Sequence, residues 1–134
     1  MFNLENSFVD RKTGFIRIDE DLIFYPGYSF EEFRMSKHYR GEDGILMISL
    51  QDKYWIGTNE FYVSFFFRKN KLYMVSYLIH DKRITMENEI DRKKIHDRIL
   101  CEMGLEVENE FSWGSIKSNY DPKGNVSSIG IVYY

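Results

Sequence analysis

Apolar and polar residues alternate in short stretches over the first third of the chain, which is the pattern of β-strands. Segments 14–18 and 22–25 alternate in this way on either side of three acidic residues, so we expect a small hairpin there. Ser29 and Glu32 then match a capping box, in which each side chain satisfies a backbone amide at the start of a helix. The pattern therefore predicts two strands followed by a short helix over 30–36.

The middle of the chain contains the most apolar strands. After a charged, glycine-rich loop, segments 45–50 and 54–57 each predict a strand. Segments 61–67 and 72–79 are nearly apolar on both faces, and they flank a turn in which Asn70 suits a left-handed backbone. Strands of this composition are covered on both faces, so we expect this hairpin at the sheet centre, covered by a helix.

A long helix is predicted over 85–103. Thr85 can cap its start, acidic residues favour the positive end of its dipole, and a glycine can end it. Its apolar face is expected to contain Met86, Ile90, Ile99, Leu100 and Met103. An acidic stretch then leads into a strand over 111–118, and a type I turn over 121–124 leads into a last strand over 126–133.

Together these elements predict an α+β fold, with a mostly antiparallel sheet of five to seven strands, one long helix packed on one face and one short helix. The 134 residues are expected to form a single domain, 1–134, since two domains would each have too small a core. Hydrophobic residues make up 43% of the chain and charged residues 29%, as in ordinary globular proteins. The aromatic share of 17% further favours sheet.

Charge and cysteine content limit the partners and the compartment. A net charge of −3 gives no basic surface for nucleic acid or anionic membranes, so we expect neither as a partner. Cys101 is the single cysteine and suits a reducing compartment. The N-terminus lacks a signal-peptide pattern, and the apolar runs are far shorter than the roughly 20 residues that cross a bilayer. We expect a cytoplasmic protein.

His96 lies on the apolar face of the predicted long helix. Its imidazole could act as a general base, but no nucleophile is placed beside it, so we favour a neutral core histidine hydrogen-bonded to a strand residue. The pairs His80-Asp81 and His96-Asp97 resemble those of HD-type metallohydrolases only by chance, since the further ligands are missing. We expect no metal and no cofactor, and a buried, inert thiol at Cys101.

Two groups of residues suggest a binding surface. Four acidic residues cluster after the long helix: Glu102, Glu106, Glu108 and Glu110. They can form a solvated face or a docking surface for a basic partner, and both interpretations stay open. The aromatic residues also exceed what one small core can hold, in particular Tyr54, Trp55, Tyr62, Tyr73, Tyr77, Tyr133 and Tyr134. Such residues suit either an interface or the solvent face of a sheet.

Segments 111–121 and 129–133 resemble the end of small uncharacterised bacterial α+β domains, and segments 25–33 and 96–100 fit the same pattern. Some domains of this appearance are similar to immunity proteins of polymorphic or contact-dependent toxin systems. The resemblance implies a bacterial protein that neutralises a cognate toxin, and it supplies no catalytic residues. The matching positions are Trp113, Ser118 and Asp121, which a structural role in the last hairpin also explains.

Our leading hypothesis is therefore a noncatalytic protein-binding domain, an immunity protein that covers the active site of a basic toxin domain. The expected contact residues are the four glutamates named above. The alternative is a small enzyme or ligand-binding domain with a pocket between the long helix and the sheet, around His96, Trp113, Ser118 and Asp121. A third possibility is a module that pairs with itself through an edge strand.

Overall fold

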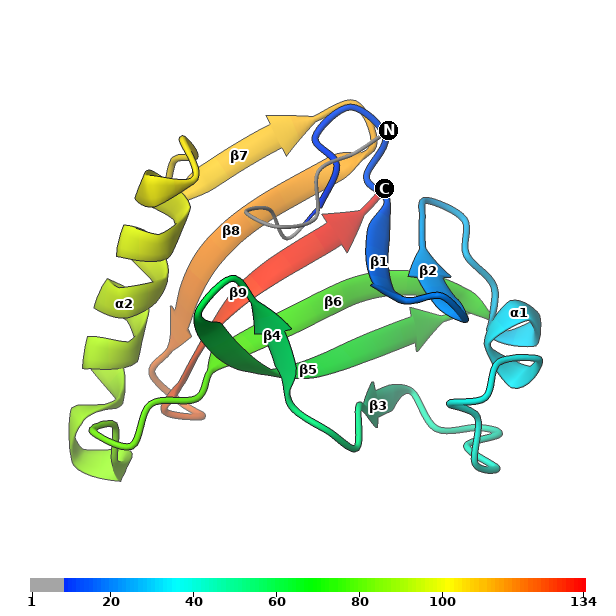
Figure 1. The fold of residues 1–134 in the computed structure, drawn as a ribbon, viewed down its shortest axis with the longest axis horizontal. Coiled ribbons are helices and arrows are strands. Elements are labelled where there is room, and N and C mark those ends of the chain that lie inside the picture. Colours follow the sequence, from blue (N-terminus) through cyan, green and yellow to red (C-terminus); the bar gives the residue numbers. More distant parts are fainter. Residues whose placement is uncertain (1–8) are drawn as a thin grey trace.

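The computed structural model of the chain describes residues 9–134, which form a seven-stranded antiparallel sheet, a separate two-stranded sheet, one long helix and two short helices. Figure 1 shows the two-stranded sheet in front of the large sheet, with the long helix along one side. The predicted α+β class is confirmed. None of the helices in the described part of the chain combines the length and apolar composition that a membrane span requires.

The N-terminal elements follow the prediction closely. Strands β1 (Ile16–Asp19) and β2 (Leu22–Phe24) pair as an antiparallel hairpin. Helix α1 (Phe30–Arg34) begins at the predicted capping box, in which the Ser29 hydroxyl accepts the Glu32 N–H at 3.2 Å and the Glu32 carboxylate accepts the Ser29 N–H at 2.8 Å. The helix ends two residues earlier than predicted.

The large sheet has a single path of neighbouring strands. Its order is β3 (Met47–Ser49), β5 (Asn59–Arg68), β6 (Lys71–Ile79), β9 (Val126–Tyr133), β8 (Gly114–Asp121) and β7 (Glu108–Phe111). Strand β4 (Tyr54–Ile56) pairs with the first residues of β5. The β5–β6 hairpin turns through Lys69 and Asn70, both in the left-handed region with φ of 51° and 64°.

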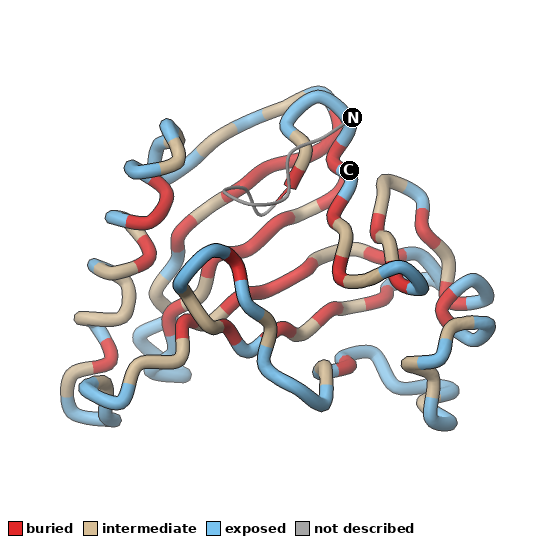
Figure 2. Tube along the Cα trace, viewed as in Figure 1, coloured by how far each residue is buried: buried red, intermediate tan, exposed pale blue. Residues whose placement is uncertain are grey.

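The β5–β6 hairpin lies inside the sheet, as predicted, and its cover comes from α1 together with β1 and β2. Phe65 of β5 is buried against Phe24 and Phe33, whose ring centroids lie 4.9 and 5.3 Å away. The long helix α2 (Glu89–Glu102) packs mainly on β8 and β9. We call the side of the sheet that contacts these elements the inner face and the opposite side the outer face. Buried and partly exposed residues alternate along the strands accordingly (Figure 2).

The start of the long helix differs from the prediction. Residues Met86–Asn88 form a 3₁₀ turn, η1, which Thr85 caps by accepting the Glu87 N–H at 3.3 Å. Because a 3₁₀ turn has three residues rather than 3.6, it changes the helical phase. Met86 and Ile90 are therefore exposed, at 86% and 44%, and do not belong to the core. Glu89, His96, Ile99 and Leu100 face the sheet instead.

The acidic stretch after α2 is itself a strand, which the prediction missed. Glu108–Phe111 pairs with β8 through a tight turn in which Phe111 lies opposite Gly114. The missed signal is the alternation of Glu108 and Glu110 with Asn109 and Phe111, a period of two residues. The last turn is placed as predicted, since the Asp121 carboxylate accepts the Lys123 N–H at 3.0 Å and β9 begins at Val126.

Candidate functional site

His96 is completely buried between α2 and the sheet. Its Nε2 accepts the Ile79 N–H at 3.0 Å, so the ring joins the helix to strand β6. Burial, helped by the positive charge of Arg92, lowers the pKa of His96 to about 3. Among the described residues Nδ1 has no hydrogen-bond partner. His96 is therefore a neutral core histidine hydrogen-bonded to a strand, which is the interpretation favoured from the sequence.

Trp113 closes the opposite end of the core, in the turn between β7 and β8. Its Nε1 donates to the Arg11 carbonyl at 2.8 Å, and its ring stacks on Phe111 with centroids 5.1 Å apart. Gly14, with φ of 77°, lies against the indole; a Cβ there would be 2.6 Å from a ring carbon. Trp113 is thus a packing residue that anchors the N-terminal segment.

Ser118 and Asp121 are on the same strand as each other but in different environments. Ser118 is buried in β8, whereas Asp121 is exposed where β8 ends. Trp113 lies at the other end of this strand, about 25 Å from Asp121 at about 3.3 Å per residue. The structure therefore does not bring Trp113 and Asp121 together, and the two pockets described below are lined by other residues.

The four glutamates are all exposed near one edge of the sheet. Glu102 lies 3.7 Å from Arg98, and Glu110 lies 3.7 Å from Lys117, so two of the four have a cationic neighbour. Glu106 and Glu108 form no ion pair with any residue that the structure describes. Glu108 and Glu110 belong to the edge strand β7 and share the outer face with their partners Lys117 and Ser115.

An apolar row crosses the outer face at right angles to the strands. Met47 of β3 lies opposite Phe66 of β5, Phe66 opposite Met74 of β6, and Met74 opposite Val132 of β9. All four side chains are at least partly exposed, and Met47 is 53% exposed. Within residues 9–134 no helix or second sheet packs on them. We call these four residues the outer row; it continues through Ser115 to Glu110 at the β7 edge.

A row of small residues runs beside the outer row. Ser49 lies opposite Ser64, Ser64 opposite Ser76, and Ser76 opposite Gly130. Ser49 and Ser64 are joined by a hydrogen bond between their hydroxyls at 2.9 Å. These side chains are short, and Ser76 and Gly130 are buried beside the taller side chains of the outer row. Neither row was recognised from the sequence, since cross-strand register is not visible in one strand at a time.

The cysteine and the aromatic residues singled out in the sequence range from buried to exposed. Cys101 is exposed rather than buried as predicted, because the buried helix face is defined by His96, Ile99 and Leu100. Tyr77 and Tyr133 are in the core. The most exposed members of the aromatic group are Trp55, Tyr62 and Tyr134. The described residues contain no group of three or more His, Cys, Asp or Glu side chains placed to hold a metal ion.

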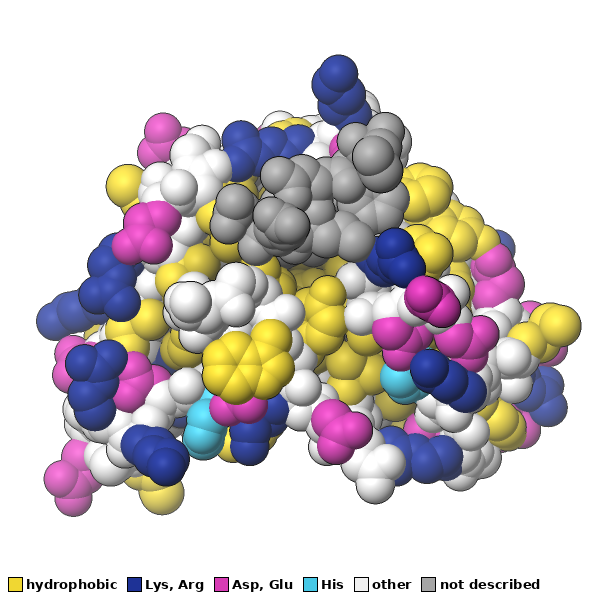
Figure 3. All heavy atoms as spheres, in the orientation of Figure 1, with side chains coloured by type: hydrophobic (Ala, Val, Ile, Leu, Met, Phe, Trp, Pro, Cys, Tyr) yellow, Lys and Arg dark blue, Asp and Glu magenta, His cyan; other side chains and the backbone are white. Residues whose placement is uncertain are grey.

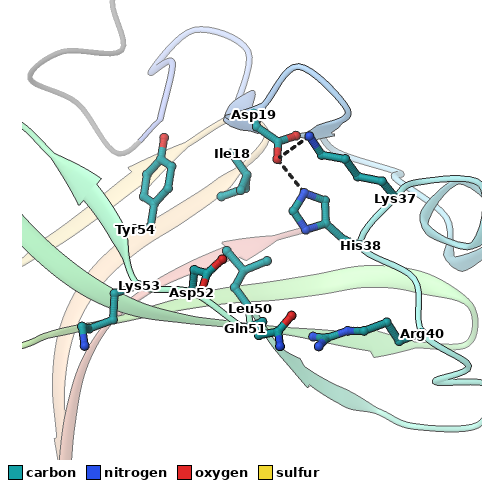
Figure 4. Close-up of a pocket in the computed structure, with 10 residues that line it drawn as sticks. All are labelled: Ile18, Asp19, Lys37, His38, Arg40, Leu50, Gln51, Asp52, Lys53 and Tyr54. Atoms are coloured by element: carbon teal, nitrogen blue, oxygen red, sulfur yellow. Dashed lines mark hydrogen bonds and ion pairs between the residues drawn. The ribbon is translucent and has the colours of Figure 1, made fainter.

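A pocket of about 240 Å³ lies between β1, the loop after α1 and the connection from β3 to β4. Its lining residues are Ile18, Asp19, Lys37, His38, Arg40, Leu50, Gln51, Asp52, Lys53 and Tyr54 (Figure 4). Figure 3 shows acidic and basic side chains gathered around a histidine over this part of the molecule. The pocket is not visible in the sequence, because its walls come from three segments that only the fold brings together.

Asp19 and His38 are in direct contact in the pocket. His38 Nε2 lies 2.6 Å from the Asp19 carboxylate, and Lys37 Nζ lies 3.8 Å from the same oxygen. Burial alone would raise the pKa of Asp19, but the hydrogen bond from His38 and the nearby positive charges lower it overall. The charge of Asp19 is thus already balanced by protein groups.

A second pocket, of about 200 Å³, lies between α2 and the β4–β5 hairpin. Trp55 and Arg98 contribute to its rim, and His80 lies inside it with its Nδ1 3.1 Å from the Tyr62 hydroxyl. This pocket lies between the long helix and the sheet. His96 and Trp113 do not line it.

No protein-family model matches the chain, and neither the curated proteins nor the solved structures compared with it gave a match. Function therefore has to be inferred from the surfaces and pockets of the chain itself.

Proposed function

We propose that this chain is a noncatalytic protein-binding domain that holds a basic partner on the outer face of its large sheet. The observation that carries the proposal is the outer row, in which Met47, Phe66, Met74 and Val132 cross four strands without a cover from residues 9–134. An antiparallel sheet usually turns a polar face to water, and a continuous apolar strip on that face favours association.

The physical gain comes from removing the outer row from water. Complete burial of one Met, Val or Phe side chain contributes roughly 1.5–3 kcal/mol, so the exposed fractions of four such residues can supply several kcal/mol. Apolar contact would therefore provide most of the affinity.

The acidic edge supports a basic partner. Glu108 and Glu110 lie on the same face as the outer row, and Glu106 lies just before them in the chain. Glu106 and Glu108 have no cationic neighbour within salt-bridge distance in the described residues, so their charge remains available. Complementary charge of this kind speeds association and selects among partners more than it adds affinity.

Segments 111–121 and 129–133 resemble the end of small bacterial α+β domains, some of which are similar to immunity proteins. On this basis we further propose that the partner is a toxin domain and that the chain is its immunity protein in the bacterial cytoplasm. An immunity protein acts by covering its toxin, so it needs an extended contact face and no catalytic groups of its own.

Partner capture with a charge-reversed variant tests the proposal. Tagged wild-type protein should recover one basic protein from cells of the native organism at low salt, because weak screening preserves the attraction of Glu106 and Glu108. The variant Glu106→Lys/Glu108→Lys should recover much less of it and should remain folded, with only a small decrease in melting temperature because the change at Glu108 puts a like charge opposite Lys117. The recovered protein, expressed alone, should arrest growth, and co-expression of wild-type chain should restore it.

A matched control replaces two exposed acids elsewhere, Glu20 and Glu31, by lysine. Equal capture by wild type and the Glu106/Glu108 variant would remove the acidic edge from the account. A captured protein without effect on growth would contradict the immunity role while leaving the binding surface in place.

A further inference from the structure

The pocket beside His38 contains two charged side chains, Arg40 and Asp52, for which the described residues provide no partner. Asp19 is balanced by His38 and Lys37, and the Lys53 ammonium lies over the Tyr62 ring, 5.6 Å from its centroid. The side chains of Arg40 and Asp52 form no hydrogen bond or ion pair within the described part of the chain. Within residues 9–134, the pocket thus has an unpaired cation at Arg40 and an unpaired anion at Asp52, besides the Lys53 ammonium that lies over the Tyr62 ring.

These two groups lie along one wall. Figure 4 shows the Arg40 guanidinium reaching toward Gln51 and the Asp52 carboxylate further along the same side, with Ile18 and His38 opposite. Separate charges of opposite sign on one wall match a small ligand that carries both an anion and a cation. A ligand with a single charge would pair with only one of the two side chains and leave the other without a partner.

Apolar residues also line the pocket. Ile18 is buried, with 9% of its surface exposed, and Leu50 and the Tyr54 ring are partly exposed. Tyr54 is fixed by donating its hydroxyl to the Arg17 carbonyl at 2.8 Å. The volume of about 240 Å³ is below the range of about 300–1,000 Å³ typical of drug-sized ligands, so it suits a molecule of amino-acid size.

We propose that this pocket binds a free apolar α-amino acid, with the carboxylate on Arg40, the ammonium on Asp52 and the side chain against Ile18 and Leu50. Guanidinium and carboxylate groups pair through two parallel hydrogen bonds, which suits Arg40 to the carboxylate end. The Asp19–His38 pair positions the opposite wall, since the 2.6 Å contact fixes the ring of His38. This site is independent of the proposed partner surface on the outer face.

Nuclear magnetic resonance titration of the ¹⁵N-labelled chain tests the proposal with matched probes. The probes are L-valine and two analogues of it: 3-methylbutanoate, which lacks the ammonium, and isobutylamine, which lacks the carboxylate. Each is added up to about 10 mM, a range that reports millimolar dissociation constants. L-Valine should shift the amide signals of residues 37–40 and 50–54 saturably. Each single-charge analogue should bind at least about tenfold more weakly. Equal binding of an analogue, or no saturable shift with L-valine, L-leucine or L-isoleucine, would overturn the proposal.

Variants locate the binding groups. Arg40→Gln and Asp52→Asn should each weaken L-valine binding by about tenfold or more while the spectrum stays well dispersed. The controls Arg98→Gln and Asp91→Asn make the same chemical changes on α2, outside this pocket, where the parent side chains pair with Glu102 and Lys94. Unchanged affinity in both pocket variants would refute the assignment.

Discussion

His96 is held between α2 and β6 by one hydrogen bond, in which its Nε2 accepts the Ile79 N–H at 3.0 Å. A ring nitrogen that accepts a hydrogen bond carries no proton, and burial disfavours the charged imidazolium. Burial first, and then the positive charge of Arg92, bring the pKa of His96 to about 3, below the usual value of 6.5. The histidine is therefore neutral in the folded chain at any physiological pH.

The pKa of His96 makes the stability of the chain depend on pH. Between pH 6.5 and about 3 the unfolded chain binds a proton on His96 that the folded chain does not, so stability falls as the pH falls. From pH 7.5 to 5 this one residue should remove about 2 kcal/mol. Urea unfolding followed by tryptophan fluorescence measures the change.

The variant His96→Gln supplies the control, because its side-chain oxygen can still accept the Ile79 N–H but does not titrate. His38 and His80 remain in both proteins, so the difference between their pH profiles reports His96 alone. Equal losses of stability in wild type and variant would show that His96 is not the source of the dependence.

Residue chemistry was predictable where it follows from one element and not where several elements meet. His96 could be assigned to the core because its position in a helical period is visible in the sequence. The Asp19–His38 pair could not be predicted, because the two residues are separated in sequence. Only the packing of β1 against the loop after α1 brings them to 2.6 Å. The exposure of Cys101 was mispredicted because the helix face was assigned from Met86 and Ile90.

At the level of whole elements, the hairpin β8–β9 depends on one close backbone contact. An added Cβ on Gly114 would lie 1.9 Å from the Val132 carbonyl oxygen, which the sheet cannot relieve by moving a side chain. Gly114→Ala should therefore cost about 3 kcal/mol of unfolding free energy. Gly130→Ala in the neighbouring strand is the control, since its Cβ would meet atoms only at 3.7 Å.

Thermal and urea unfolding of both variants measure the effect. Gly130→Ala should change stability by less than about 0.5 kcal/mol, as for most substitutions that meet no steric conflict. Similar stability of the two variants would mean that β8 and β9 are further apart at Gly114 than described.

Elements with a local signal were predicted well, and those defined by pairing were not. The capping box at Ser29 and the turn at Asn70 are short patterns with one physical solution, and both are found. Strand β7 was missed because its glutamates suggested a solvated connection, although their alternation also fits an edge strand. Charged residues on an edge strand oppose sheet extension, which disfavours self-pairing through β7.

At the scale of the whole molecule, the two proposed sites lie on different parts of the fold. The α1, β1–β2 and α2 elements cover the inner face of the sheet and leave the outer row without a cover among residues 9–134 (Figure 1). The pocket at His38 lies between β1, the loop after α1 and the connection from β3 to β4, away from the outer row. A partner protein on the outer face and a small ligand in the pocket can therefore bind together.

The most direct test of the central claim is the affinity of the captured partner for two matched double variants, measured by calorimetry. Met47→Gln/Met74→Gln makes the outer row polar at nearly constant shape, and Met35→Gln/Met86→Gln makes the same change at two methionines that are 87% and 86% exposed elsewhere. The account predicts a loss of about tenfold or more for the outer pair and less than about twofold for the control pair. Equal affinities of the two variants would contradict binding through the outer face.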